Sequence, residues 1–233
     1  MSEGGKAFIK AFGKPDPKVS NGLVFKDEAA RLLWNLDYEE IGAGWFMNRF
    51  LYLFGAGLER LRPCLDAWSF LVPKHRDRMI VGHNAHGAIL VLDDANSGDS
   101  SIHVLDPFLV EYWGDANMHL GNMFGYFLPR KEMRGFEDDS VYKAWTKRER
   151  RYLLPDMILA PKTPLGLGGE MKLDNFQEEN IFEYYKTTAP IYKKALSRAN
   201  AGKAASESGK KAERSEKKPQ GAKKKAPAGK GKR

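Results

Sequence analysis

Residues 79–105 read MIVGHNAHGAILVLDDANSGDSSIHVL, and this stretch is the strongest indication of the fold class. Three runs rich in aliphatic and β-branched residues, 79–81, 88–92 and 102–105, are separated by a turn containing glycine and by a polar loop. Such runs, bounded by Gly, Asn, Asp and Ser, are typical of strands joined by tight connections. Because short connections join antiparallel neighbours, the stretch predicts an antiparallel β meander.

Helical patterns flank this meander on both sides, because apolar residues recur there at the three- and four-residue spacing of one helix face. The predicted flanking elements are a helix over 5–12, a helix over 29–36, a buried strand over 50–54, a helix with Pro63 in its first turn, a helix capped by Asp115 that ends before Pro129, and a helix over 138–151. The predicted fold is therefore α+β, with a central, mainly antiparallel sheet flanked by helices.

The segment 161–177, PKTPLGLGGEMKLDNFQ, leads from an apolar run into a further predicted helix. Asp174 can accept a hydrogen bond from the backbone donors of a first helical turn, and Gln177 completes a capping-box pattern three residues later. Apolar residues then recur at helical spacing as far as Leu196. Pro190 is expected to bend or split this helix, because proline has no backbone donor and its ring crowds the preceding turn.

Two regions of the chain resemble a known family. PLGLGG at 164–169 and LDNFQEENIFEYY at 173–185 resemble the C-terminal domain of bacterial type VI secretion immunity proteins. FGKP at 12–15, GAGWF at 42–46 and LDAW at 65–68 resemble the GAD-like domain that heads these proteins. The resemblance implies a GAD-like domain over 1–95 and an immunity-type domain over 96–196. The boundary near residue 95 is soft, and the sheet can continue across it.

The chain has 233 residues and a formal net charge of +8, which is unevenly distributed. Residues 197–233 hold 13 Lys and Arg against 3 Asp and Glu, a net charge of +10, whereas residues 1–196 hold 25 basic and 27 acidic residues, a net charge of −2. The C-terminal segment has no aromatic or large aliphatic residue, so it cannot bury enough apolar surface to offset the entropy of ordering. It is predicted to be a disordered basic tail over 197–233.

The lysine clusters of this tail are candidates for contact with nucleic acid. They would bind DNA phosphates weakly and without sequence preference, because no aromatic side chain is interleaved to stack on bases. A solubilising tail with no ligand is an equally weighted alternative. The candidate nucleic-acid-binding residues are Lys210, Lys211, Lys217, Lys218, Lys223, Lys224 and Lys225.

No residue is predicted to be catalytic, and no metal or other cofactor is predicted. His83 and His86 flank a predicted hairpin turn, not a helix on which an i, i+4 pair would converge on a metal. The carboxylate clusters lie in polar loops, which lack the surroundings that separate the pKa values of an acid–base pair. The single cysteine, Cys64, excludes a disulfide within this chain and is expected to be a buried thiol.

A dense aromatic run, from Trp34 through Trp45 to Phe54, is expected to lie mostly in the core. Any portion of it that is exposed would become a protein-binding patch, because aromatic side chains anchor interfaces while charges select the partner.

The resemblance implies a non-enzymatic immunity protein that binds a cognate secreted DNase toxin and covers or distorts its active site. A DNA-binding toxin should carry a basic cleft, and the slightly acidic segment of residues 1–196 has the charge that steers association with such a surface. The candidate toxin-binding residues are Asp93, Asp94, Asp138, Asp139, Glu170 and Asp174.

The N-terminal residues lack the apolar core of a signal peptide, and no apolar run approaches the roughly 18 residues needed to span a bilayer. A cytoplasmic location without a membrane partner is therefore expected. The main alternative function is a DNA-associated accessory protein that acts through the basic tail. A metallohydrolase that uses the histidines is a further, more remote alternative.

Overall fold

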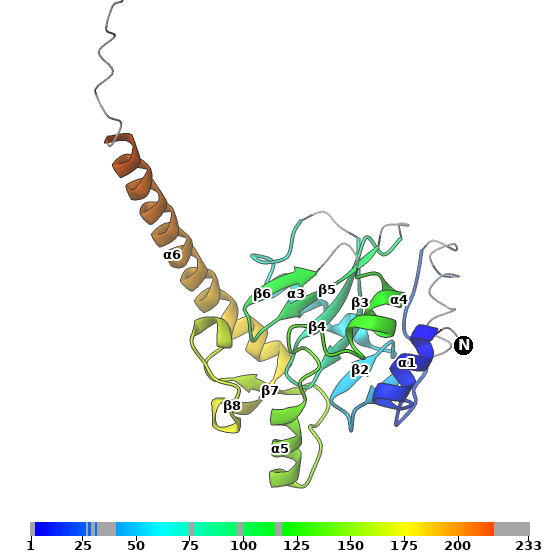
Figure 1. The fold of residues 1–233 in the computed structure, drawn as a ribbon. Helices are drawn as coiled ribbons and strands as arrows, with labels where there is room; N and C mark the ends of the chain where they lie inside the picture. Colours follow the sequence, from blue (N-terminus) through cyan, green and yellow to red (C-terminus); the bar gives the residue numbers. More distant parts are fainter. Residues whose placement is uncertain are drawn as a thin grey trace, which may run out of the picture. The chain divides into compact units, whose positions relative to one another are not determined.

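The computed structural model describes residues 3–26, 28, 31, 41–74, 77–96, 100–114 and 118–216, with side chains as far as Arg198 except that of Leu120 (Figure 1). Two compact units divide the chain, Met1–Pro190 and Ile191–Arg233. Most of the helix predicted over 29–36, the predicted capping residue Asp115 and the tail lysines from Lys217 onward lie outside the described residues.

A six-stranded antiparallel sheet forms the centre of the first unit, and its strands lie in sequence order. These strands are β1 (Gly44–Phe46), β2 (Leu51–Leu53), β3 (Arg78–Asn84), β4 (Ile89–Asp93), β5 (Ser101–Asp106) and β6 (Glu111–Gly114). The predicted meander is β3 to β5, and the strand expected over 50–54 is β2, which confirms the α+β class. β4 pairs with β5 along its whole length. The two domains predicted over 1–95 and 96–196 therefore share one sheet.

Helices cover this sheet, and several begin where the sequence predicts. They are α1 (Glu3–Phe12), the 3₁₀ turn η1 (Leu58–Leu61), α3 (Arg62–Ala67), α4 (Leu120–Asn122) continuing into the π-helical turn η2 (Met123–Phe127), α5 (Ser140–Glu149) and α6 (Ile181–Glu216). Pro63 lies in the first turn of α3. Backbone N–H groups in a first turn have no acceptor within the helix, so proline loses no hydrogen bond there. Gly4 of α1 and Gly125 of η2 meet so closely that a Cβ on either would touch the other backbone.

Both faces of the sheet are buried, as the burial of all five residues of β4 shows. On one face, Leu90 and Leu92 belong to the hydrophobic core that also contains Phe8 of α1 and Phe124 of η2. On the turn after β3, the backbone carbonyl of Gly87 accepts a hydrogen bond from Tyr185 Oη of α6 at 2.9 Å. Burial of one large apolar side chain contributes about 1.5–3 kcal/mol, so the apolar contacts of this core stabilise the sheet.

Trp68 and Cys64 illustrate how α3 is held in place. The indole Nε1 of Trp68 donates to the backbone carbonyl of Tyr185 at 3.0 Å, and both side chains are buried. Cys64 is 1% exposed, which confirms the prediction of a buried thiol. Burial, with the nearby carboxylate of Asp156, raises the pKa of Cys64 to about 12, so this thiol stays protonated at neutral pH.

A second, two-stranded sheet corrects one prediction. β7 (Met157–Pro161) pairs antiparallel with β8 (Phe176–Asn180), so residues 176–180 form a strand and not the first turn of a helix. The 3₁₀ turns η3 (Leu165–Leu167) and η4 (Leu173–Asn175) lie in the connection. The capping box predicted at Asp174 and Gln177 is therefore wrong, because the backbone donors of β8 are used in the ladder with β7.

The helix instead begins at Ile181, and Asn180 caps it. Asn180 Oδ1 accepts hydrogen bonds from the backbone N–H groups of Phe182 at 3.0 Å and Glu183 at 3.3 Å. α6 is continuous across Pro190, so the predicted split does not occur. It also continues past Leu196 to Glu216, through a segment rich in Ala, Lys and Glu, which favour helix.

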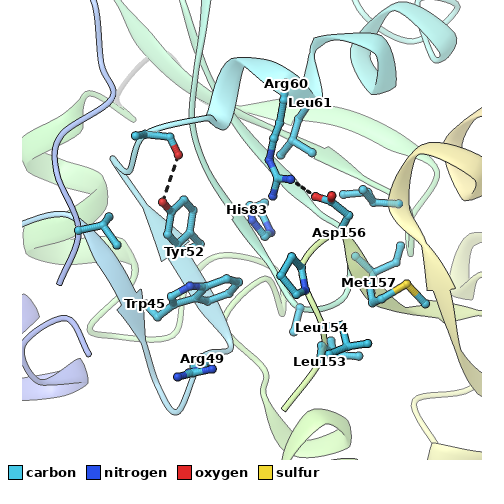
Figure 2. Close-up of a pocket in the computed structure, with 16 residues that line it drawn as sticks. Trp45, Arg49, Tyr52, Arg60, Leu61, His83, Leu153, Leu154, Asp156 and Met157 are labelled. Carbon is cyan, nitrogen blue, oxygen red and sulfur yellow. Dashed lines mark hydrogen bonds and ion pairs between the residues drawn. The ribbon is translucent and has the colours of Figure 1, made fainter. Parts of the chain in front are cut away.

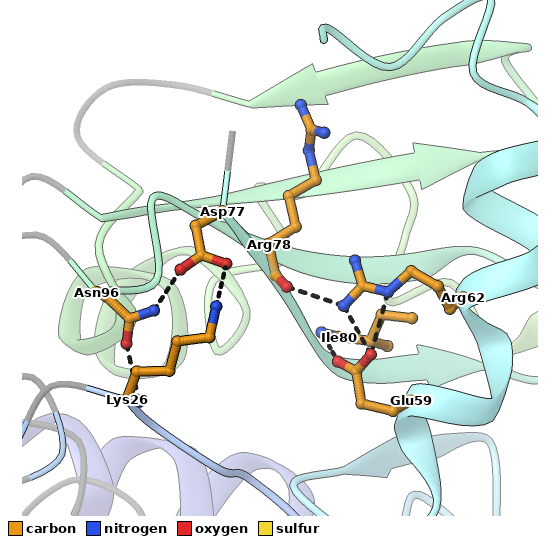
Figure 3. Close-up of polar contacts among 7 residues, drawn as sticks. All are labelled: Lys26, Glu59, Arg62, Asp77, Arg78, Ile80 and Asn96. Carbon is orange, nitrogen blue, oxygen red and sulfur yellow. Dashed lines mark hydrogen bonds and ion pairs between the residues drawn. The ribbon is translucent and has the colours of Figure 1, made fainter. Parts of the chain in front are cut away.

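Polar contacts tie the chain that precedes β1, and the turn that precedes α3, to the central strands (Figure 3). The backbone N–H of Lys26 donates to Asn96 Oδ1 at 3.0 Å, and Lys26 Nζ lies 3.5 Å from Asp77 Oδ1. Arg62 Nη2 donates both to Glu59 Oε2 at 2.6 Å and to the carbonyl of Arg78 at 2.9 Å. These contacts hold η1 beside β3, which places Arg60 of η1 near the same strand.

Candidate partner-binding face and aromatic cavity

The six carboxylates proposed from the sequence do not lie together. Asp93 is 1% exposed at the end of β4, where Oδ1 accepts hydrogen bonds from Arg78 Nε at 2.7 Å and from Tyr112 Oη at 2.8 Å. Asp94 follows it in a turn with a positive φ of 54° and is half-buried. Asp93 thus belongs to the internal structure of the sheet, and its buried carboxylate is not placed to contact a partner.

The other four carboxylates gather in one region of the first unit. Asp138 and Met171 line the same cavity of about 90 Å³, and α5, which begins after Asp139, packs against η4, which contains Asp174. Glu170 lies between them in the chain. Asp138, Glu170 and Asp174 are exposed and Asp139 is half-buried. We call these four residues the acidic face.

Neighbouring groups moderate the charge of the acidic face. Asp139 forms an ion pair with Lys143 at 2.9 Å, and Glu170 forms one with Lys172. Partial burial raises the pKa of Asp138, but hydrogen bonds from Ser140 and the nearby His86 and Lys131 outweigh it, so the net pKa is lowered. Asp138 is therefore ionised at neutral pH, and Asp139 and Glu170 each lie beside a lysine. The face can recognise a cationic surface, although some of its charge is already paired.

The small cavity beside the acidic face has an aromatic floor. His86 is 1% exposed, and its ring lies 5.2, 5.1 and 5.4 Å from the rings of Phe50, Phe108 and Phe176. Burial lowers the pKa of His86 to about 4, against the opposing effects of the Asp138 backbone and carboxylate and of the Leu159 backbone. His86 is thus a neutral, core histidine at physiological pH.

Asp106 lies in the same cavity and is largely saturated with hydrogen bonds. Its Oδ1 accepts from the backbone N–H groups of Phe108 at 2.8 Å and Leu109 at 3.2 Å, and its Oδ2 accepts from Trp113 Nε1 at 3.3 Å. Burial raises the pKa of Asp106 above its usual value. The residues that line this cavity include no Ser, Thr or Cys.

A larger cavity of about 250 Å³ lies over β1, β2 and β3 (Figure 2). Its floor is a row of rings from three adjacent strands, because Trp45 pairs with Tyr52 and Tyr52 pairs with His83 in the strand register. The ring centroids of Trp45 and Tyr52 are 4.8 Å apart, and those of Tyr52 and His83 are 5.6 Å apart. All three rings are half-buried.

The opposite wall of this aromatic cavity comes from distant segments of the chain. Residues 153–158, which lead into β7, line it together with Arg60 and Leu61 of η1 and Ile181 of α6. Arg60 and Asp156 form an ion pair across the cavity, as Figure 2 shows. Sequence reasoning missed this site. One local sequence pattern could have indicated the cavity, namely that Trp45 and Tyr52 alternate with buried neighbours on two short strands. No local pattern indicates that Asp156 approaches Arg60.

The residues proposed for nucleic-acid contact are only partly described. Lys210 and Lys211 lie on α6, and the remaining five lie outside the described residues. Across the described regions of the chain, no group of three or more His, Cys, Asp and Glu side chains is placed to hold a metal ion. Within the same residues, none of the helices combines the length and the hydropathy that a membrane crossing requires.

The sequence matches no protein-family model and no curated protein. Among solved structures, the chain is similar to Atu4351 from Agrobacterium tumefaciens, with a TM-score of 0.49 and 15% sequence identity. The similarity covers 79% of this chain and 87% of that one.

Proposed function

We propose that this chain is a non-enzymatic, cytoplasmic immunity protein, which binds a cognate type VI secretion DNase toxin and covers or distorts its active site. The observation that carries the proposal is the acidic face. Asp138 lines a small concave surface with Met171, the neighbour of Glu170, and α5, which follows Asp139, packs against η4, which contains Asp174. Inhibition by binding needs such a surface and no chemistry of its own.

Apolar side chains lie next to the acidic face. Leu165 and Met171 line the cavity that Asp138 also lines, and Leu167 is 43% exposed in the same connection. Protein interfaces commonly combine a small apolar centre with a charged rim, in which the charges select the partner and speed association. A DNase surface that binds phosphates would present the complementary positive charge.

The test is co-expression with the toxin encoded beside the gene for this chain, followed by co-purification and a growth assay. A Glu170→Lys/Asp174→Lys variant should bind the toxin at least about tenfold more weakly, since each reversal sets like charges against each other. Both positions are exposed, so the fold should be retained.

Glu3→Lys/Asp66→Lys is the matched control, because it changes the net charge equally at exposed positions outside the acidic face. This control should protect growth as well as the unmodified chain. Equal loss of toxin binding in both variants would assign the effect to net charge and not to the acidic face. Full binding in both would show that the interface lies elsewhere.

A further inference from the structure

The aromatic cavity has a floor of three rings that are inclined to one another and partly uncovered. Trp45, Tyr52 and His83 are successive cross-strand partners, so their rings stand side by side on one face of the sheet. The Trp45 and His83 rings also approach each other, with centroids 5.6 Å apart and planes at 89°. All three remain half-buried around a space of about 250 Å³.

The polar groups around this floor have definite hydrogen-bonding roles. Burial lowers the pKa of His83 to about 4, so its ring is neutral at physiological pH. His83 Nδ1 lies 3.3 Å from the carbonyl of Asn84, and a carbonyl can only accept. Nδ1 therefore carries the proton, and Nε2 is left as a hydrogen-bond acceptor. Tyr52 Oη donates to the carbonyl of Ala56 at 3.3 Å, so its lone pairs also remain as acceptors.

The charged groups of the cavity favour an anion. Two arginines, Arg49 and Arg60, and one aspartate, Asp156, are its charged lining residues, which leaves a net charge of +1 while His83 is neutral. The Arg60 guanidinium uses some of its donors in the ion pair with Asp156, and a guanidinium has five N–H groups in all. Arg49 is exposed at the edge of the cavity, where its guanidinium lies 4.8 Å from the Tyr152 ring.

We propose that the aromatic cavity binds a small planar heteroaromatic anion, namely a ring with an N–H donor and a carboxylate or phosphate substituent. The ring stacks on Trp45, beside the inclined ring of Tyr52. Its N–H donates to Nε2 of His83, and the anionic group accepts hydrogen bonds from Arg60. The volume limits the ring system to one ring or a fused pair, because pockets for drug-sized ligands begin at roughly 300 Å³.

Because the cavity is built from separate segments of the chain, such a ligand would stabilise the folded protein. Asp156 belongs to the segment that leads into β7, whereas Arg60 belongs to η1 and the floor to β1–β3. A ligand that contacts both η1 and the floor would bind the folded protein only, since these elements come together only on folding, and would stabilise it by mass action. The site lies on lining residues other than those of the acidic face, so its test is independent of the proposed function.

The experiment uses the full chain and four probes in calorimetric titration. Orotate carries the N–H donors and a carboxylate, uridine monophosphate carries the same ring type with a phosphate, uracil lacks the anion, and benzoate lacks the ring N–H. Orotate or uridine monophosphate should bind saturably, and the better of the two identifies the anionic group. Uracil and benzoate should each bind about tenfold or more weakly, because each lacks one charged or neutral hydrogen-bonding group.

Arg60→Gln should weaken binding of the anionic probe by about tenfold or more and leave uracil unaffected, because a charge-assisted hydrogen bond is lost. Arg49→Gln changes an arginine at the opposite end of the floor (Figure 2) and should weaken binding less than Arg60→Gln does. Arg148→Gln is the matched control, since it removes an arginine from an exposed ion pair with Glu149 outside the cavity. Trp45→Leu should weaken every probe that binds.

Three results would overturn the proposal. One is the absence of saturable binding for both anionic probes. Another is binding of uracil or benzoate as tight as that of the anions. The third is an unchanged affinity of the anionic probes for Arg60→Gln, with thermal unfolding showing that the variant is folded.

Discussion

Arg78 Nε donates to Asp93 Oδ1 at 2.7 Å, and these two residues are direct partners in the register between β3 and β4. Their side chains are 11% and 1% exposed. The same oxygen accepts the Tyr112 hydroxyl of β6, and the Tyr112 ring stacks on that of His103 of β5 with planes at 7°. One buried carboxylate therefore joins side chains from the ends of several strands.

Removal of this carboxylate should destabilise the protein strongly. Asp93→Ala leaves the Arg78 guanidinium and the Tyr112 hydroxyl without this acceptor in a buried place, and breaking a buried ion pair from one side costs about 3–5 kcal/mol. Chemical denaturation measures the change in unfolding free energy. Glu149→Ala, which breaks an exposed pair with Arg148, should cost less than about 1 kcal/mol. Equal effects of the two changes would contradict the structural role of Asp93.

The stability of the protein should fall in mild acid because of its buried histidines. The pKa of His86 is about 4 in the folded protein, whereas an unfolded histidine titrates near about 6.5. Between these values the unfolded chain binds more protons, so the unfolding free energy decreases as the pH falls from about 6.5 to about 4. His86 alone accounts for about 3 kcal/mol, and His83 behaves in the same way.

The measurement is the unfolding free energy against pH for His86→Phe, whose ring replaces imidazole among Phe50, Phe108 and Phe176. Part of the acid-dependent loss should disappear, while His83 and the lowered pKa of Asp138 maintain the rest. An unchanged profile in His86→Phe would mean that the acid sensitivity comes from other groups.

The start of α6 can be tested at Asn180, which caps the helix in the structure, and at Asp174, which the sequence predicts as the cap. Asn180→Ala removes the acceptor of two backbone N–H groups and should cost about 1 kcal/mol of unfolding free energy. Asp174→Ala, at an exposed position in η4, should change it by less than about 0.5 kcal/mol. Thermal or urea unfolding of both variants distinguishes them, and the reverse order would favour the capping box at Asp174.

The C-terminal lysines should bind duplex DNA weakly and with a steep salt dependence. If about five of them contact phosphates, log K should fall with log[salt] at a slope of roughly −4 to −5, since each contact releases about 0.9 counterion. Replacement of all 13 Lys and Arg residues of the segment 197–233 by Gln in the full chain should abolish this binding. Titrations on two unrelated DNA sequences at several salt concentrations should give equal affinities. Binding that survives the replacement would place the DNA contact elsewhere on the chain.

Local signals along the chain were sufficient to predict several elements. The strands around residues 79–105 follow from aliphatic runs and turn residues a few positions apart, and the start of α3 follows from Pro63. The burial of Cys64 was also predictable, because apolar residues surround it in the sequence. Each of these features depends on neighbours within one turn or one hairpin, where the chain has few alternatives.

Contacts between residues that are distant in the sequence depend on tertiary packing alone. Residues 176–180 carry a helix-start pattern but form β8, because the backbone of β7 supplies ladder partners that outweigh local preference. Asp93 is buried and Asp138 is exposed, although both lie in acidic runs. Asp156 reaches Arg60 across the aromatic cavity. Such contacts come from the packing of separated elements into one close-packed core. The hydrophobic periodicity along the chain therefore does not predict them.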